Sequence, residues 1–372
     1  MIAAGLTTVA PTSRTTPTFA AANYRHTAWL SSDGVEMWNS SSTVLWRTVD
    51  YWATDTELRT FDIPVRGVRQ LDSGELLVAL QGDSDSPGEV WRTTGYTRAD
   101  PTGCTWTKVL TCSYNDTYAS GDWLMWCYGD VLLVGEYGAK TAGANARGTY
   151  LSMDDGLTWT QIYDWEGSGK HMHGCAHDRY ADMLWLCFGD SSQGYAYSTD
   201  WRAKVAAGQQ PTWVEHITNE TTGQSDAVQP VGIYPMRDRV IMGTDDTKNG
   251  LYRIERDDYD TIVPVFVADS PGTMKTISGM PYRHQDSEDY PLIWPWVRLP
   301  GITGEVGVAA SYDGLAWHVL WRDSSRGYTG VGPFTCVGPA ANGNCYGWMA
   351  DAIEASGTRL ILPYPSWATA AH

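Results

Sequence analysis

Short apolar runs recur along this chain of 372 residues at a nearly constant spacing. Each run is four to six residues long and lies between Gly, Asp and Ser residues, which is typical of β-strands separated by tight turns. Equivalent positions in four of these runs are 53 to 55 residues apart: Leu76, Val131, Leu184 and Arg239. A period of this length indicates a repeat architecture in which each repeat is one supersecondary unit.

Each repeat reads as four short strands, and no segment has a convincing amphipathic helical pattern. Such a sequence favours antiparallel sheets repeated around an axis, an arrangement that protects edge strands. We therefore predict an all-β fold, a six-bladed β-propeller, with a seven-bladed ring as the alternative. The predicted blades cover residues 62–112, 120–165, 170–218, 228–268 and 274–322, and a sixth that joins 345–368 to 25–50.

The two ends of the chain are expected to complete one blade and so to close the ring. Residues 27–38 read as third and fourth strands, and residues 358–363 as a second strand with none after it. A seventh blade would lie near residues 323–344, which otherwise read as a Gly- and Pro-rich loop overhanging the axis. Residues 1–24 are predicted to be an extended arm or a frayed terminus, and residues 25–372 a single domain.

A specific turn motif connects some of the predicted strands. Residues 152–159 read Ser-Met-Asp-Asp-Gly-Leu-Thr-Trp and match S-x-D-x-G-x-T-W, and variants begin at Ser31, Ser198 and Ser311. In such a turn the carboxylate accepts backbone N–H groups and the Gly supplies a positive φ. The pattern resembles the Asp box (BNR repeat) of sialidase-type propellers. The resemblance implies a structural role for four carboxylates: Asp33, Asp154, Asp200 and Asp313.

The predicted functional face is opposite these turns, where first strands begin and second strands end. Four second strands end in a Gly-acid or similar turn, which makes these carboxylates catalytic candidates: Asp83, Glu136, Asp190 and Asp245. Carboxylates about 5 to 10 Å apart could serve a glycosidase, whereas the alternative is that they cap turns or hold Ca²⁺. The same face supplies candidate ligand-binding residues: Arg66, Trp123, His171, His173, Asp190 and Trp348.

A transition-metal site is a further hypothesis for this face. His171 and His173 are two residues apart, so a regular strand would point both side chains in the same direction. With Asp190 they would offer two imidazoles and a carboxylate, which suits Zn²⁺. The alternative is a solvated polar channel without metal. The order H-x-H-G…D…L-W…G-D over residues 170–190 also resembles propellers encoded in actinobacteriophage tail regions.

The resemblance to sialidases does not extend to their substrate. Sialidases carry an F-R-I-P motif whose Arg grips the substrate carboxylate, whereas residues 61–64 here read Phe-Asp-Ile-Pro. Asp62 stands where the Arg would be, and a carboxylate there repels the group that it should bind. Neutral sugars or cations are therefore expected as ligands in place of sialic acid.

Charge and cysteine content narrow the classes of partner. Lys and Arg number 26 against 43 Asp and Glu, a net charge of −17 that repels phosphate backbones, so nucleic acid is not expected as a partner. No apolar run approaches the roughly 18 residues of a membrane-spanning helix. Most of the seven cysteines are expected to be buried thiols, with Cys175/Cys187 and Cys336/Cys345 as alternative bridges.

Trp and Tyr, at 19 and 21 residues against 5 Phe, suit both cores and sugar-stacking surfaces. The candidate stacking residues are Trp123, Trp126, Trp296 and Trp348. The phage resemblance, an Arg-rich composition and a start without a secretory signal pattern point the same way as these aromatic residues. Together they favour a phage tail propeller that is assembled in the host cytoplasm beside other tail subunits. Its expected ligand is a host-surface glycan or receptor. The alternatives are a glycoside hydrolase or lyase acting on a neutral envelope polysaccharide, and a purely architectural tail subunit.

Overall fold

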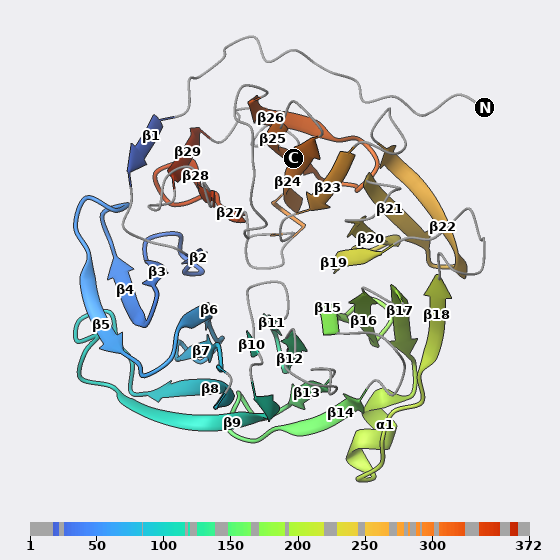
Figure 1. Cartoon of the computed structure of the whole chain (residues 1–372), viewed down its shortest axis with the longest axis horizontal. Helices are drawn as coiled ribbons and strands as arrows, with labels where there is room; N and C mark the ends of the chain where they lie inside the picture. The colour runs from blue at the N-terminus through green and yellow to red at the C-terminus, as the bar shows by residue number, and fades with distance from the viewer. Residues whose placement is uncertain are drawn as a thin grey trace.

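The computed structural model of the chain shows a ring of strands (Figure 1). It describes residues 18–21, 26–83, 85–115, 118–119, 125–137, 148–164, 171–189, 193–218, 229–244, 250–267, 274–278, 282, 288–290, 292–300, 305–323, 335–349 and 358–363. Strands dominate these residues, and the helix found among them is α1 (Trp201–Ala206). No helix within the described ranges is long and apolar enough to cross a membrane.

The described strands form seven antiparallel sheets around a central axis (Figure 1). The first three in chain order contain β2 (His26–Leu30), β3 (Met37–Ser41), β4 (Val44–Thr48) and β5 (Thr56–Thr60); β6 (Val65–Gln70), β7 (Leu76–Leu80), β8 (Pro87–Thr94) and β9 (Thr105–Asn115); and β10 (Tyr118–Ala119), β11 (Met125–Tyr128), β12 (Val131–Tyr137), β13 (Gly148–Ser152) and β14 (Thr160–Asp164).

Three more sheets follow along the chain. They contain β15 (His171–Asp178), β16 (Met183–Gly189), β17 (Gln193–Ser198) and β18 (Val214–Thr218); β19 (Pro230–Pro235), β20 (Arg239–Thr244), β21 (Gly250–Glu255) and β22 (Asp258–Val267); and β23 (Met274–Ser278), β24 (Leu292–Pro300), β25 (Glu305–Ser311) and β26 (His318–Asp323). The seventh sheet, the closing blade, combines both ends of the chain in the order β1 (Thr18–Ala21), β29 (Thr358–Pro363), β28 (Asn344–Met349) and β27 (Thr335–Val337).

The predicted all-β propeller is confirmed, and the sheets counted over the described residues give its seven-bladed alternative. The ring is closed by both ends of the chain, as predicted, but through β1, whose Thr18 lies opposite Ile361 of β29. Residues 27–38 belong to β2 and β3, the first and second strands of a separate blade, and do not complete the C-terminal sheet. Residues 358–363 form the third strand of the closing blade, not the second, because β27 adds a strand before them. β27 lies inside the segment that was predicted to be an overhanging loop.

The second strands are buried on both faces, because each sheet packs between two neighbouring blades. Every side chain of β7 is buried, and the same is true of β16. Such strands read as continuous apolar runs without alternation, which is why they carry the sequence repeat. Much of the tryptophan surplus also fills this core, since four indole side chains are fully buried: Trp38, Trp185, Trp201 and Trp294.

The predicted turn chemistry is present at Asp154, between β13 and β14. Its carboxylate accepts hydrogen bonds from the Ser152 hydroxyl at 2.8 Å and from the Thr158 backbone N–H and hydroxyl at 2.9 and 2.6 Å. Gly156 has the expected positive φ of 78°, and its carbonyl accepts a hydrogen bond from the Trp159 indole. The carboxylate therefore holds the hairpin closed, as a structural residue does.

The other predicted turns repeat this chemistry with one difference of position. Asp313 accepts the N–H groups of Leu315 and Ala316 between β25 and β26, and Asp200 accepts that of Thr212 between β17 and β18. Asp33 accepts the Val35 N–H, but its turn joins β2 to β3, the first and second strands of a blade. The motif therefore marks the connection between two neighbouring antiparallel strands, and it does not fix which strands of the blade these are.

The sequence analysis missed a fifth turn of this kind, between β4 and β5. Asp50 accepts hydrogen bonds from the Thr48 hydroxyl, at 2.8 Å, and from the Thr54 N–H and hydroxyl, at 2.8 and 2.6 Å. The spacing equals that of Ser152, Asp154 and Thr158. Tyr51 and Trp52, with φ of 58° and 73°, occupy the positive-φ positions, so the glycine that marks the motif in a sequence is missing.

Replacing Asp154 with Ala should lower the free energy of unfolding by about 1 to 2 kcal/mol, because three donors lose their acceptor at an exposed turn where water replaces part of the loss. Urea denaturation of the wild type and the variant measures this difference. The matched control is Asp62→Ala. It removes the same side chain at an exposed position, where the carboxylate has no hydrogen bond with any described residue. Equal destabilisation by both changes would contradict the structural role of the turn.

Acid should weaken the fold through the turn carboxylates. Burial raises the pKa of Asp33, Asp154 and Asp313, but hydrogen bonds to each carboxylate outweigh it, so that each pKa lies below the ordinary value of 3.8. A lowered folded pKa contributes stability that is present above the unfolded pKa and lost as pH falls through the folded pKa. We expect the free energy of unfolding to fall below about pH 4. A urea midpoint unchanged from pH 5 to pH 3 would contradict this.

Candidate functional site

A pocket of about 530 Å³ opens where the first strands of neighbouring blades end. Its walls come from the C-terminal ends of β2, β6, β11 and β15, with Tyr282 completing the rim. In an antiparallel blade the turn after the first strand lies on the same face as the turn after the third strand. The pocket therefore shares its face with the turn carboxylates, opposite to the face on which the sequence placed the site.

Four aromatic side chains line this pocket. Trp29 and Tyr282 lie edge to face with ring centroids 5.5 Å apart, and Trp126 and Tyr128 do so at 4.9 Å. Trp29 and Tyr128 approach to 6.2 Å and join the two pairs. Behind Trp29, the buried guanidinium of Arg69 lies 4.0 Å from the ring centroid, a cation–π contact that holds the indole in place.

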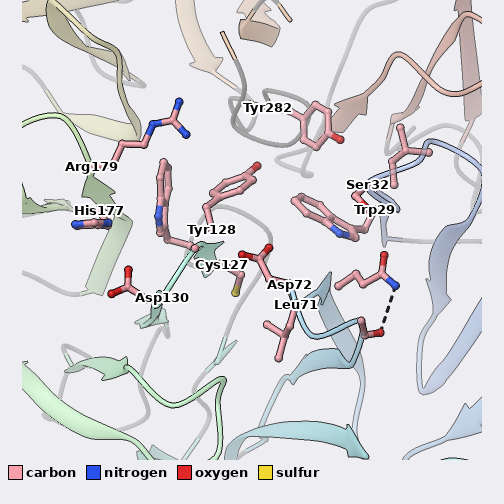
Figure 2. A pocket seen from close by; sticks show the side chains of 15 residues that line it. Trp29, Ser32, Leu71, Asp72, Cys127, Tyr128, Asp130, His177, Arg179 and Tyr282 are labelled. Carbon is pink, nitrogen blue, oxygen red and sulfur yellow. Dashed lines mark hydrogen bonds between the residues drawn. The ribbon is translucent and has the colours of Figure 1, made fainter. Parts of the chain in front are cut away.

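A carboxylate lies among these rings. Figure 2 shows Asp72 between Tyr128 and Trp29, at the end of β6. Asp72 is exposed and has neither a hydrogen bond nor an ion pair with any other described residue. Asp130, a second acid of the pocket, is different because it pairs with Arg202 at 3.2 Å.

The charged groups at the opposite wall are tied to one another. His177 Nε2 lies 3.1 Å from Asp182 Oδ1, and Arg202 contacts the same carboxylate at 3.0 Å. Burial lowers the pKa of His177 below its usual value although Asp182 acts in the opposite direction, so the imidazole is neutral at pH 7. Arg179 donates a hydrogen bond to the Tyr180 hydroxyl at 2.9 Å and stacks on that ring.

Of the residues predicted from the sequence, Trp126 lies in this pocket, and the candidates of the opposite face do not line it. Asp83 is exposed and accepts hydrogen bonds from Asp85 N and Ser86 N within its own turn. Arg66, at a bulge of β6, donates to the side chain of Gln81. Both therefore have local structural partners.

Glu136, a predicted catalytic acid, is fully buried between two blades. Its Oε1 accepts hydrogen bonds from Ser113 N at 2.6 Å and from the Tyr150 hydroxyl at 2.9 Å, and its Oε2 accepts Gly148 N at 2.9 Å. Burial raises its pKa above the usual value despite these three donors. Ser113 belongs to β9 of the preceding blade, so the carboxylate links neighbouring sheets.

His173 also lies between blades. Its Nδ1 is 3.0 Å from the carbonyl oxygen of Pro230, its ring stacks on Tyr137, and a Cβ at Gly189 would lie 2.1 Å from its Cε1. A bulge between Met172 and Gly174 breaks the alternation of β15, so the argument that His171 and His173 point the same way does not apply. Within the described ranges, no group of three metal-ligating side chains is present.

Several predicted site residues fall on parts of the chain that the structure does not describe. Trp123, Asp190 and Asp245 lie outside the described residues, and of His171, Trp296 and Trp348 only the backbone is described.

The cysteines are all free, and Cys175 and Cys336 lie opposite Leu186 and Gly347, so the two bridges considered do not form. Burial raises the pKa of Cys127, which lines the pocket, to about 12. That thiol is therefore unreactive at neutral pH.

Comparison with known proteins supports the fold. No protein-family model and no curated protein sequence matches the chain. A chain of a structure described as "Crystal Structure of Mitotic Checkpoint Complex" is 13% identical with a TM-score of 0.57, covering 97% of this chain and 98% of that chain. The structure "YCF48 bound to D1 peptide" is 13% identical with a TM-score of 0.51, covering 94% and 97%. Sqt1 of Saccharomyces cerevisiae is 9% identical with a TM-score of 0.53, covering 94% and 98%. At these identities the likeness shows the propeller fold alone.

Proposed function

We propose that this chain is a receptor-facing propeller of a phage tail and that it holds a host-surface glycan in the aromatic pocket. The observation that carries the proposal is the pocket itself, in which the carboxylate of Asp72 lies between Tyr128 and Trp29 and Tyr282 lines the rim. Aromatic rings stack on the apolar faces of sugars, and a carboxylate accepts hydrogen bonds from their hydroxyl groups.

Binding is favoured over cleavage by the state of the carboxylates. Hydrolysis of a glycosidic bond uses two carboxyl groups on either side of that bond. In this pocket Asp130 is paired with Arg202, which leaves Asp72 as the acid available to a ligand. Asp83 and Glu136 lie in separate surroundings, one in an exposed turn and one buried between blades.

The assignment to a phage tail rests on sequence features. The order of residues 170–190 resembles tail propellers, and the hydrogen bonds of the Asp154 turn are those expected for an Asp box. Arg outnumbers Lys by 20 to 6, which fits a G+C-rich genome. Within a virion the chain would contact other tail subunits through surfaces away from the pocket.

Incubation of the full chain with envelope polysaccharide from actinobacterial cells tests the proposal. We expect the chain to be retained on the immobilised polysaccharide without release of reducing ends. Released oligosaccharide would overturn the binding function in favour of a hydrolase, and an unsaturated product would indicate a lyase. Failure to bind any such polysaccharide would overturn the glycan-binding proposal.

A purely architectural role is a second candidate, which one observation favours. Four exposed apolar side chains lie in turns between third and fourth strands, on the face of the pocket: Val49, Met153, Leu157 and Leu315. They lie in three different blades, and a partner that spans this face could contact all of them. Under this alternative, a folded Tyr128→Ala variant would leave adsorption of the assembled particle unchanged, whereas glycan recognition through the pocket requires a loss.

A further inference from the structure

We infer that the sugar recognised by the pocket carries a protonated amine, which pairs with Asp72. This inference rests on the proposed glycan-binding function and adds the chemical class of the ligand. Its basis is the combination, in one pocket, of electron-rich ring faces and a carboxylate that has no partner among the described residues.

The first step concerns the charge of Asp72. The other acids near the pocket each have a cationic neighbour, since Asp130 and Asp182 both contact Arg202 at 3.2 and 3.0 Å. Asp72 has no corresponding cation, and its side chain is exposed toward the pocket (Figure 2). A ligand that brings its own positive charge would complete the pair that the protein leaves incomplete.

The second step concerns the cations around the pocket. Arg69 is buried, donates to the carbonyl of Val68 at 2.8 Å and lies over Trp29, so its charge is engaged behind the indole. Arg179 is directed to Tyr180, whose ring centroid lies 4.9 Å from the guanidinium. Neither of these contacts involves the carboxylate of Asp72, which is therefore open to a group of the ligand.

The third step concerns the rings. Faces of Trp and Tyr are electron-rich and attract ammonium groups, and the attraction grows where water is excluded. Tyr128 and Trp29 lie on either side of Asp72 (Figure 2). Trp29 is buried and already faces Arg69, so an ammonium group held by the carboxylate would gain chiefly from Tyr128, which is half-buried. A hydroxyl group in the same place forms a weaker hydrogen bond, because only one partner is charged.

The net charge of −17 acts in the same direction at longer range. A strongly negative protein raises the local concentration of cationic ligands and repels anionic ones. Because this effect is screened by salt, it increases the rate of encounter more than it sets the selectivity. The selectivity itself is assigned to Asp72.

Isothermal titration of the full chain with glucosamine, N-acetylglucosamine and glucose, at a pH where the free amine is protonated, tests this inference. We expect glucosamine to bind about tenfold more tightly than the other two, as a hydrogen-bonded charge pair provides. In Asp72→Asn this preference should disappear with an unchanged melting temperature. The control Asp62→Asn removes the same charge from an exposed residue between β5 and β6, on the opposite face, and should keep the preference.

The outcomes separate this inference from the function on which it rests. Equal binding of the three sugars, or a preference that survives in Asp72→Asn, would overturn the amine inference and leave glycan binding standing. Methylammonium that competes as strongly as glucosamine would show that the sugar ring adds nothing, and would overturn the inference as stated. If neither these sugars nor the envelope polysaccharide bind, the proposed function fails as well.

Discussion

Replacing Asp178 with Ala is expected to lower the free energy of unfolding by about 3 to 5 kcal/mol. Asp178 ends β15 and is fully buried, and its carboxylate accepts hydrogen bonds from two nitrogens of Arg256 in the next blade. It also accepts Tyr180 N and Ala181 N at 3.0 and 3.2 Å. Removal of the carboxylate leaves a largely buried guanidinium and two backbone donors without this acceptor.

Chemical denaturation of Asp178→Ala and of a matched variant, Asp130→Ala, measures this difference. Asp130 pairs with Arg202, but both side chains are exposed, so its loss should cost no more than about 1 kcal/mol. Similar effects of the two changes would contradict the account, which attributes the difference to burial. Since Asp178 also accepts the backbone N–H groups of Tyr180 and Ala181, its loss should loosen the turn that carries Arg179 and so weaken one wall of the pocket.

Replacing Glu136 with Gln is expected to lower the free energy of unfolding by about 2 to 3 kcal/mol. Both carboxylate oxygens accept hydrogen bonds, from Ser113 N and the Tyr150 hydroxyl at one and from Gly148 N at the other. The amide of Gln would turn an NH₂ group toward one of these donors and leave it unsatisfied in a buried place. Glu136→Ala removes all three hydrogen bonds and opens a cavity, so it should cost more, about 3 to 5 kcal/mol.

Urea denaturation and polysaccharide binding, measured on the same Glu136 variants, distinguish a structural acid from a catalytic one. If Glu136 is structural, its replacement lowers the free energy of unfolding, and the protein that remains folded binds polysaccharide as the wild type does. Tyr150→Phe is the matched control, because it removes one of the three donors and should give a smaller loss. A Glu136→Gln protein of unchanged stability that has lost a chemical activity would contradict our interpretation.

The propeller fold could be predicted because its second strands are buried on both sides. Burial makes β7 and β16 continuous apolar runs, and their equal spacing reveals the repeat. Near the two ends of the chain, the position of each strand within its blade was predicted wrongly, for two physical reasons. The turn at Asp33 uses the same hydrogen bonds as turns after third strands, although it follows a first strand. The three residues of β27 are too few, within a Gly- and Pro-rich stretch, to give a strand pattern.

The pocket was harder to predict than the fold. Trp29 was assigned to a third strand, which placed it away from the axis, whereas it lies at the end of the first strand β2. Asp72 is one of several acids in turns, and nothing local in the sequence shows that aromatic rings from other blades surround it. The available signal was the pair of Trp126 and Tyr128 at the end of a first strand, equivalent to Trp29.

The central claim is that ligand binds at the face where first strands end. Binding of envelope polysaccharide to Tyr128→Ala and to Arg66→Ala, measured side by side by equilibrium titration, tests it most directly. Tyr128 lines the pocket, while Arg66 lies near the start of β6 on the opposite face. The account predicts that Tyr128→Ala weakens binding at least about tenfold and that Arg66→Ala leaves it unchanged. Loss of binding in Arg66→Ala with full binding in a folded Tyr128→Ala would contradict it.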